Sequence, residues 1–575
     1  SFCCIQNYPR ASVITHKDRF HTNKTHFLFS EIHRKLYTMV KEHIKHTKFD
    51  VAKAPFTIAK KAAKAVFWPV EVAKTLATSA ADTAFKVVGV STEDAPLASL
   101  GGNESIYDLA NDNLNYSAII YYYTELRTHI KRKALDLAVE KGLSTESAPG
   151  EPSQFMLLHN AIMFKIEAEE RVKSEDMPES ESTEMGEALT EYKTSVVQLG
   201  DLAKKFNLDH GDLKIFTTYV DILRNPKSMQ AIKADLTRYD HVIEPNFRLI
   251  MGGTAWNRSN VDELIEGGKD IYVHYIDDVF NSTSLDLKGL KNALEVELVW
   301  AIIVNKTDKK ITVVFRGSSN ARDWYQDLSV NMKDCMLPGF VSQVKEKNKT
   351  KFGRVHEGFY DYLFDETAMG PNGSTKSKGE EIIGMLRADF FDKAEFDDYS
   401  LVVTGHSLGA SLSTLFSFRC ACMNEPFRLV TNVSFASPFL GDEEFRKLFT
   451  KLEIDGKIRH LRVSNYEDAV PLVPICNFPF GLNLYKHVGM NIRLYDDQFL
   501  NPANYRRFYP KLGSIMDSAR NAMHYNVPLG LTVGVGGNHF CDEYDKRLNL
   551  QKTKDQLSML TLEGLYADKD ITGWP

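Results

Sequence analysis

The chain has 575 residues, more than a single domain usually holds, and its length alone predicts about two to four domains. Hydrophobic residues make up 43% and charged residues 25%, so the composition allows a large buried core and excludes disorder as the default state. The formal net charge of −6 is too small to indicate a particular class of partner. The seven cysteines show no metal-ligand spacing and force no disulfide framework, and we expect neither a metal nor a cofactor.

Residues 1–100 form a basic N-terminal region, with 15 Lys/Arg against 8 Asp/Glu. Within it, residues 49–90 place most lysines on one side of a helix and Val51, Ile58 and Val66 on the other. Such a helix suits a membrane surface or a lipid–water interface, and the alternative is a helix packed on the protein's own surface. No nucleic-acid-binding motif accompanies the lysines, so no nucleic-acid partner is expected.

The sequence leaves the compartment open. No run of about 18 apolar residues is present, so we expect no membrane-spanning helix. The first 30 residues lack the apolar core of a signal peptide, yet nine Asn-x-Ser/Thr sequons keep a secretory route possible. Association with a membrane or a lipid droplet is favoured, and the oligomeric state is not predicted.

Residues 101–250 are predicted to be a helical region. Apolar residues recur at three- and four-residue spacing over 105–143 and 153–173, which predicts two helices joined by a loop. Residues 167–190 are strongly acidic with few apolar side chains, and we expect a solvated linker there.

Residues 251–575 are predicted to form an α/β-hydrolase domain with a mostly parallel central sheet. The β-branched runs 298–304 and 311–315 flank a turn and predict a hairpin. Helices and strands then alternate, and this alternation is typical of a parallel sheet covered by helices. The predicted helices are 380–391 and 408–423, and the predicted strands are 400–404, 429–435 and 458–463.

The segment Leu401–Gly409 carries the chemistry, because it places the pattern G-x-S-x-G between a predicted strand and a predicted helix. This context is that of a nucleophile elbow, in which a tight turn exposes the serine hydroxyl. Gly405 and Gly409 would relieve the crowding of the turn, and the helix N-terminus would stabilise negative charge. We therefore predict that Ser407 is a nucleophile; His406 beside it is expected to point elsewhere.

A serine needs a base, and in α/β-hydrolases the acid and the histidine follow the serine along the chain. Asp468 lies just beyond the predicted strand 458–463 and is the predicted acid, with Glu467 as its rival. His539 follows a glycine-rich loop and precedes the last helices, so it is the predicted base, with His524 second. His487 lies ahead of a predicted strand and is interpreted as structural.

An ester hydrolase also needs donors for the oxyanion. One is expected to be the N–H of Leu408, directly after the nucleophile. The second must come from an earlier loop, and Ser318, at the end of the predicted strand 311–315, offers an N–H and a hydroxyl.

These segments together resemble class 3 lipases, the fungal-lipase-like family, over roughly residues 290–550. The resemblance rests on Phe315–Ser319, Asp323–Leu328, Val355–Phe359, Gly405–Ala410, the Asp468 loop, Tyr485–Gly489, and His539 followed by Tyr544. It implies triacylglycerol lipase, phospholipase or related acyl hydrolase activity without a metal. It also implies a mobile lid over about 319–337, in which Trp324, Leu328 and Met332 recur at helical spacing; an ordinary surface helix is the alternative.

The sequence thus predicts a serine carboxylester hydrolase that acts on a lipid or ester substrate at a lipid–water interface. A triacylglycerol lipase is favoured. A phospholipase or galactolipase of the same family is the first alternative, and a lipid-surface binding protein with an inactive hydrolase fold is the second.

Overall fold

The computed structural model describes residues 104–145, 151–174, 182–224, 228–239, 262, 264–265, 267–277, 298–317, 331–335, 353–364, 377–423, 426–466, 468, 470–472, 485–496, 505–508 and 537–568. Contacts divide the chain into two units, Ser1–Pro96 and Leu97–Pro575. The first unit, with the predicted amphipathic helix 49–90, lies outside the described residues.

An eight-stranded sheet forms the centre of the second unit, in the order β1-β2-β3-β6-β7-β8-β9-β10 among the described residues. Its strands are β1 (Ile271–Asp277), β2 (Trp300–Asn305), β3 (Lys310–Phe315), β6 (Ser400–His406), β7 (Val430–Phe435), β8 (Ile458–Asn465), β9 (Met490–Leu494) and β10 (Tyr505–Phe508). The strands from β3 to β9 pair in parallel, whereas β1, β2 and β10 pair antiparallel at the edges. The predicted hairpin is β2–β3, in which Trp300 pairs with Phe315.

The central strands are buried on both faces, which explains their long apolar runs. The sheet is therefore mostly parallel and covered by helices, and the predicted α/β-hydrolase fold is confirmed. The strand β4 (Met332–Asp334) pairs with β5 (Arg354–His356) in a separate two-stranded sheet.

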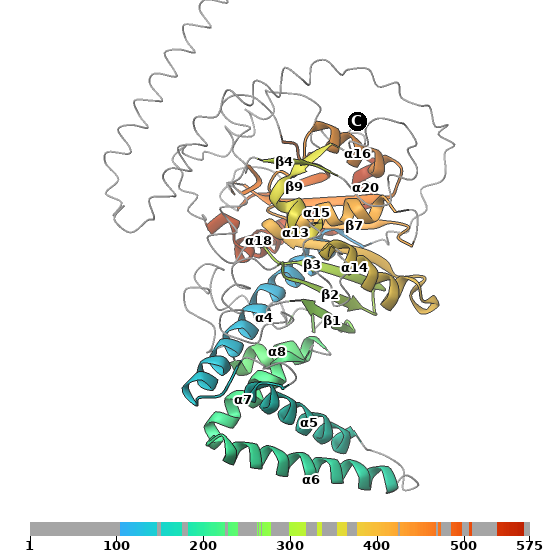
Figure 1. Cartoon of the computed structure of the whole chain (residues 1–575). Helices are drawn as coiled ribbons and strands as arrows, with labels where there is room; N and C mark the ends of the chain where they lie inside the picture. Colours follow the sequence, from blue (N-terminus) through green and yellow to red (C-terminus); the bar gives the residue numbers. More distant parts are fainter. Residues whose placement is uncertain are drawn as a thin grey trace, which may run out of the picture. The chain divides into compact units, whose positions relative to one another are not determined.

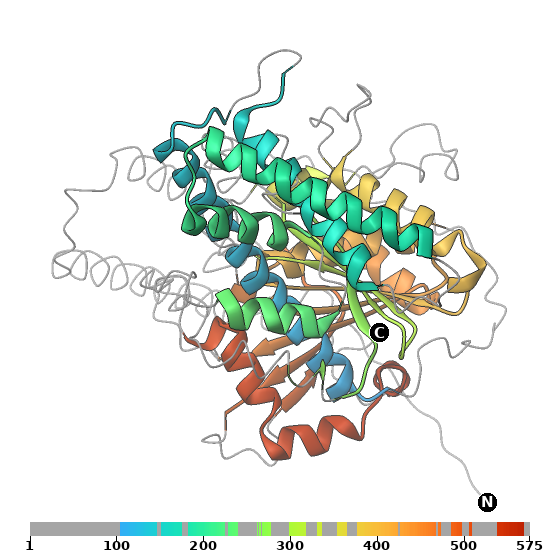
Figure 2. The same ribbon diagram turned by 90° about the horizontal axis from the view of Figure 1, so that it is seen from below.

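Two groups of helices cover the two faces of the sheet (Figure 1). One face packs against α13 (Glu357–Phe364), α14 (Lys378–Leu386), α15 (Leu408–Ala421) and α16 (Glu443–Ile454), with a π-helical turn at Arg387–Phe391 and a 3-10 turn at Ala394–Phe396. The other face carries α4 (Ile106–Glu140), α18 (Cys541–Leu548), α19 (Gln551–Ser558) and α20 (Leu562–Ala567). Figure 2 shows α4 in blue beside the C-terminal helices in red.

Helix α4 runs from the sheet toward the remaining N-terminal helices. It begins at the N-cap Ser105, whose hydroxyl accepts a hydrogen bond from the N–H of Asp108. It contacts β3, β6 and β7 of the sheet as well as α7 (His210–Leu223) and α8 (Met229–Tyr239). The N-terminal part of the second unit is thus helical, as predicted.

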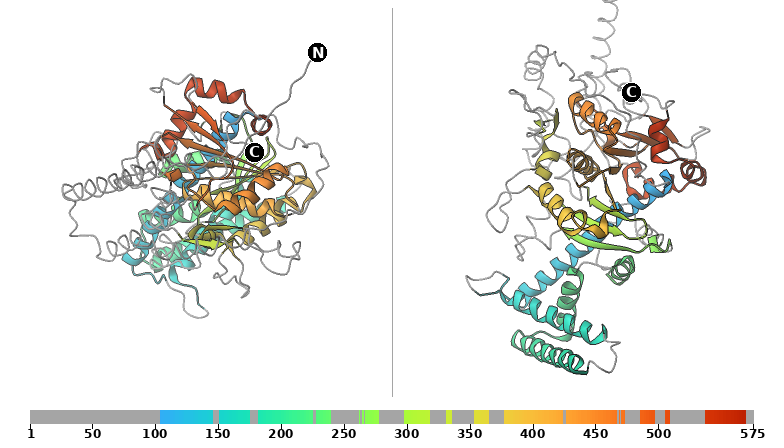
Figure 3. Two further views of the ribbon diagram at one scale, coloured as in Figure 1. Left: turned by 90° about the horizontal axis from the view of Figure 1, so that it is seen from above. Right: turned by 90° about the vertical axis from the view of Figure 1, so that its right-hand side faces the viewer.

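The predicted acidic linker at 167–190 is wrong over most of its length. Helix α5 (Gln154–Ser174) covers its first part and α6 (Ser182–Lys205) covers its last part. One of the acidic side chains, Glu169, pairs with both Lys165 and Lys173 at helical spacing, which favours a helix over a solvated linker. Helices α5 and α6 lie side by side, away from the sheet (Figures 1 and 3).

Within the described part of the chain, no helix is both long enough and apolar enough to cross a membrane.

Candidate active site

The segment from β6 to α15 turns sharply at Ser407, whose backbone has φ 61° and ψ −127°. A positive φ is costly for a residue with a side chain, so the surrounding structure must hold this turn. A Cβ atom on Gly405 would lie 2.3 Å from the carbonyl oxygen of Gly409, and one on Gly409 would lie 2.1 Å from that of Phe315. Both glycines of G-x-S-x-G are therefore required by close backbone contact, as in a nucleophile elbow.

The structure brings the three predicted catalytic side chains together. The hydroxyl oxygen of Ser407 lies 3.1 Å from Nε2 of His539. Nδ1 of His539 lies 3.2 and 3.1 Å from the two carboxylate oxygens of Asp468. Since the carboxylate only accepts, Nδ1 carries the proton and Nε2 is free to accept the serine proton. This is the arrangement of a serine nucleophile, a base and an acid that orients the base.

The carboxylate of Asp468 has further donors. The hydroxyl of Tyr544 donates to it at 2.7 Å, and the N–H of Val470 donates at 2.9 Å. The carboxylate is buried with 1% exposure, so these bonds replace the water that a charge otherwise requires. Tyr544 comes from α18, which places the acid against the C-terminal helices.

The backbone around His539 is fixed by three contacts. Asn465, at the end of β8, donates to the carbonyl oxygen of Asn538 at 3.0 Å. Arg547 donates to the side chain of Asn538 at 2.5 Å. Nε2 of His406 lies 2.8 Å from the carbonyl oxygen of His539 itself. The 3-10 turn Gly537–His539 is thereby tied to β8, to α18 and to the elbow.

His406 is fully enclosed, and burial lowers its pKa well below the usual range, with a smaller contribution from the neighbouring His539 ring. It is therefore neutral. As predicted, it points away from the serine hydroxyl, and its partners are Tyr121 and the backbone of His539.

Of the two predicted oxyanion donors, Leu408 lies among the described residues. Leu408 is the first residue of α15, and the first N–H groups of a helix have no intrahelical acceptor. Its N–H can therefore donate to an oxyanion. Gly317 and Leu408 share a small hollow of about 10 Å³. Ser318, the predicted second donor, lies outside the described residues.

The predicted lid helix does not extend to Met332. This residue lies in β4, where it pairs with His356 of β5. Strand pairing holds an extended backbone, so the four-residue spacing that predicted a helix ends before this point. Trp324 and Leu328 lie outside the described residues, and their part in a lid stays a prediction.

Of the alternative candidates for the acid and the base, only His487 lies among the described residues. Glu467 and His524 lie outside the described residues. His487 stacks on Phe439, and its Nε2 lies 2.8 Å from the carbonyl oxygen of Pro471. Burial lowers its pKa well below the usual range, which agrees with a structural histidine.

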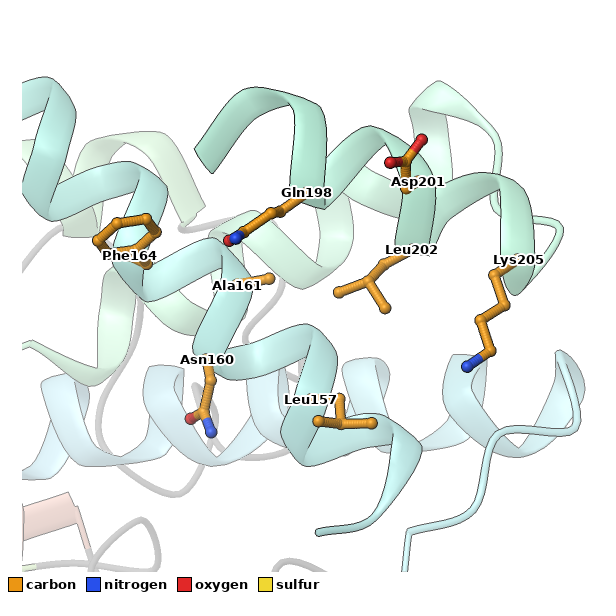
Figure 4. Close-up of a pocket in the computed structure, with 8 residues that line it drawn as sticks. All are labelled: Leu157, Asn160, Ala161, Phe164, Gln198, Asp201, Leu202 and Lys205. Carbon is orange, nitrogen blue, oxygen red and sulfur yellow. The ribbon is translucent and has the colours of Figure 1, made fainter. Parts of the chain in front are cut away.

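Two other features of the described residues resemble sites. The carboxylates of Glu104, Asp112 and Asp308 could approach a metal, but Lys269 bonds to Asp112 at 2.5 Å and to Asp308 at 3.1 Å, and Lys310 bonds to Glu104 at 2.5 Å. The lysines supply the charge that a cation would. A groove of about 500 Å³ lies between α5 and α6 (Figure 4), with no titratable group of the Ser407 site in it. It is lined by Leu157, Asn160, Ala161, Phe164, Gln198, Asp201, Leu202 and Lys205.

Sequence reasoning missed several supporting residues. Tyr544 was among the residues that carry the family resemblance, but only the fold shows that its hydroxyl bonds to Asp468. Asn465 lies three residues before Asp468, and no pattern in the sequence marked it as an anchor. Tyr121 lies in a run of three tyrosines more than two hundred residues before the elbow, where the sequence carries no signal.

Known proteins resemble this part of the chain. Residues 312–478 match the family described as Lipase (class 3). Phospholipase A1-IIgamma of Arabidopsis thaliana is 29% identical over 258 residues, which cover 42% of this chain and 52% of that protein. Phospholipase A1-II 4 of Oryza sativa subsp. japonica is 33% identical over 189 residues, or 32% of this chain and 43% of that protein. The chain thus spans about half the length of these relatives or less.

Among solved structures, the Lip2 lipase from Yarrowia lipolytica is 17% identical, covers 47% of this chain and 78% of its own, and has a TM-score of 0.31. The sheet order and the elbow define the class of the protein as an α/β-hydrolase. The match of residues 312–478 to class 3 lipases agrees with the resemblance that the motifs predicted.

Proposed function

We propose that this protein is a serine carboxylester hydrolase of lipids in which Ser407, His539 and Asp468 form a catalytic triad. The observation that carries the proposal is the pair of contacts at His539, 3.1 Å to the Ser407 hydroxyl and 3.1 Å to Asp468. Since both contacts lie within hydrogen-bond reach, the geometry favours an active enzyme over a binding protein with an inactive hydrolase fold.

In the first half of the reaction, Ser407 Oγ attacks the carbonyl carbon of the ester while Nε2 of His539 takes its proton. Asp468 stabilises the imidazolium through Nδ1. The carbonyl oxygen becomes an oxyanion, which the N–H of Leu408 stabilises, with Ser318 as the proposed second donor. The intermediate then collapses, and the alcohol oxygen leaves with the proton from His539.

In the second half, water attacks the acyl-enzyme. Nε2 of His539 takes a proton from this water, and the new oxyanion forms in the same place. Collapse returns the proton to Ser407 Oγ and releases the fatty acid. Burial of the site, with 3% exposure at Ser407 and 4% at His539, strengthens each of these electrostatic interactions.

For the substrate we propose the acyl ester of a phospholipid first and triacylglycerol second. Phospholipid is supported by the printed names of the two plant relatives, both phospholipases A1. Triacylglycerol is the substrate that the motifs favoured. To hydrolyse either substrate, the enzyme must act at a lipid–water interface. Trp324 and Leu328 remain the proposed lid residues.

The test compares fatty-acid release from phosphatidylcholine vesicles and from emulsified triacylglycerol by the full chain and by Ser407→Ala. We expect release by the wild type and a loss of at least about 10⁴-fold in Ser407→Ala. The faster substrate identifies the subclass. Equal rates for the two proteins on both substrates and on soluble esters would overturn the proposal.

A further inference from the structure

Helix α4 reaches the candidate active site from outside the segment that matches class 3 lipases. Tyr121, in the middle of α4, is buried with 1% exposure. Its hydroxyl oxygen lies 3.4 Å from Nδ1 of His406 and 3.4 Å from the carbonyl oxygen of His406. Its ring meets that of His406 edge to face, with centroids 6.0 Å apart. The tyrosine therefore contacts the residue directly before the nucleophile.

The same hydroxyl also presses on the strand end that leads to the predicted oxyanion loop. A Cβ atom on Gly317 would lie 1.9 Å from the Tyr121 oxygen and 2.5 Å from the carbonyl oxygen of His406, so both groups exclude a side chain at this position. One turn further along α4, the hydroxyl of Thr124 accepts a hydrogen bond from Arg316 at 3.1 Å. Helix α4 thus supports both the elbow and the end of β3.

The proton on His406 can be assigned from its partners. Nε2 faces a carbonyl oxygen, that of His539, which can only accept, so Nε2 carries the proton. Since burial keeps His406 neutral, Nδ1 is an acceptor. The Tyr121 hydroxyl has one proton, which it can donate to this Nδ1 or to the carbonyl oxygen of His406, each 3.4 Å away. The hydrogen bonds run in one direction, from Tyr121 to His406 and from His406 to the backbone of His539.

We propose that Tyr121 is a positioning residue for the proposed base His539 and acts through His406. The inference rests on the proposed function. Without the Tyr121 hydroxyl, the His406 ring loses the polar partner that faces its Nδ1 and helps to hold its orientation. The carbonyl of His539 then loses a well-placed donor, and the distance between Nε2 and Ser407 Oγ becomes less well defined. Small displacements of a base slow proton transfer more than they weaken substrate binding.

The first experiment measures kcat and KM of the full chain with a soluble ester, p-nitrophenyl butyrate, so that lipid binding does not enter. Tyr121→Phe removes one hydroxyl, and we expect kcat to fall about threefold to tenfold, as for one neutral hydrogen bond, with KM unchanged. The matched control is Tyr123→Phe in the same helix, whose buried hydroxyl donates to Asp235 at 2.9 Å, away from the elbow. It should leave kcat unchanged, with the folded fraction of both variants measured by circular dichroism.

The second experiment tests whether Tyr121 acts through His406. We expect His406→Ala to lower kcat by about a hundredfold, as for a displaced catalytic group. His406→Gln, whose amide can still donate to the His539 carbonyl, should recover part of this loss. Tyr121→Phe should then add nothing to His406→Ala.

The outcomes separate the two proposals. If the wild type hydrolyses the ester but Tyr121→Phe leaves kcat unchanged, only the positioning proposal is overturned. The same holds if the losses of Tyr121→Phe and His406→Ala are fully additive in the double variant. A wild type that neither hydrolyses the ester nor reacts with a fluorophosphonate overturns the proposed function.

Discussion

The elbow and the α5–α6 pair differ in how they hold polar groups. Around Ser407, polar side chains are buried, and each is fixed by partners from other elements: Asp468 by Tyr544 and Val470, His539 by Asp468 and His406. In α5, charged groups at the surface pair at helical spacing, such as Lys165 with Glu169. The second region holds the groove of about 500 Å³, yet the first holds the proposed catalytic triad.

The comparison shows that the volume of a cavity alone does not locate the candidate active site. A groove between two amphipathic helices follows from the packing of long side chains. A strained serine, a neutral buried histidine and a buried carboxylate with three donors require several elements to cooperate. Predictions that compare the two regions should therefore show large effects at the elbow and small effects in the helix pair.

The largest expected effect comes from adding one methyl group at the elbow. In Gly409→Ala the new Cβ would lie 2.1 Å from the carbonyl oxygen of Phe315, which cannot move without disturbing β3. We expect a loss of about 3 kcal/mol in the free energy of unfolding, together with loss of esterase activity. Urea unfolding followed by circular dichroism measures the first quantity. Unfolding at the wild-type urea midpoint would contradict the close packing.

Tyr544→Phe should have the next largest effect. It removes the 2.7 Å bond to the Asp468 carboxylate and the bond to the N–H of Asn465. A bond to a charged group contributes about 1.5–3 kcal/mol, so we expect kcat to fall at least about tenfold. Steady-state hydrolysis of a soluble ester measures it. A kcat within twofold of wild type, or a change in KM alone, would show that Tyr544 does not support the acid.

The same glycine-to-alanine change should have the opposite sign in α6. Gly200 lies inside this helix, and a Cβ there would meet nothing within 4 Å. Alanine has a higher helix propensity than glycine, so Gly200→Ala should stabilise the protein by about 0.5–1 kcal/mol without changing kcat. Urea unfolding gives the sign directly. A destabilisation like that of Gly409→Ala would mean that the two regions are packed alike.

The smallest effect depends on pH. Burial raises the pKa of Asp542, in the first turn of α18, from 3.8 to about 6. The folded state therefore holds this proton more tightly, and stability is lost as pH rises from about 4 through about 6. Asp542→Asn should gain no more than about 1 kcal/mol relative to wild type at pH 7, after allowance for solvent screening, and nothing at pH 3.5. Melting temperatures across this range test the sign, and a pH-independent difference would contradict it.

The sequence was sufficient for most of the sheet and for the elbow. The β-branched runs and the glycine pattern around Ser407 are local signals, so β2, β3, β6, β7 and β8 and the elbow could be predicted. Asp468 and His539 could be ranked above their neighbours from chain order, and the structure places both beside Ser407.

What could not be predicted depends on distant contacts. Acidic composition suggested a linker at 167–190, because composition does not show that Glu169 has bases one turn away on each side. Helical spacing suggested a helix through Met332, because pairing with β5 depends on residues more than twenty positions later. The approach of Tyr121 to His406 spans 285 residues and leaves no mark in the local sequence.

The most direct test of the central claim is covalent labelling. A fluorophosphonate reacts with a serine only when a nearby base activates it. Incubation of the full chain followed by intact-mass and peptide mass spectrometry should show one adduct per chain, on the peptide that contains Ser407. His539→Ala should slow its formation by at least about a hundredfold. An adduct on another serine, or equal labelling of wild type and His539→Ala, would contradict the account.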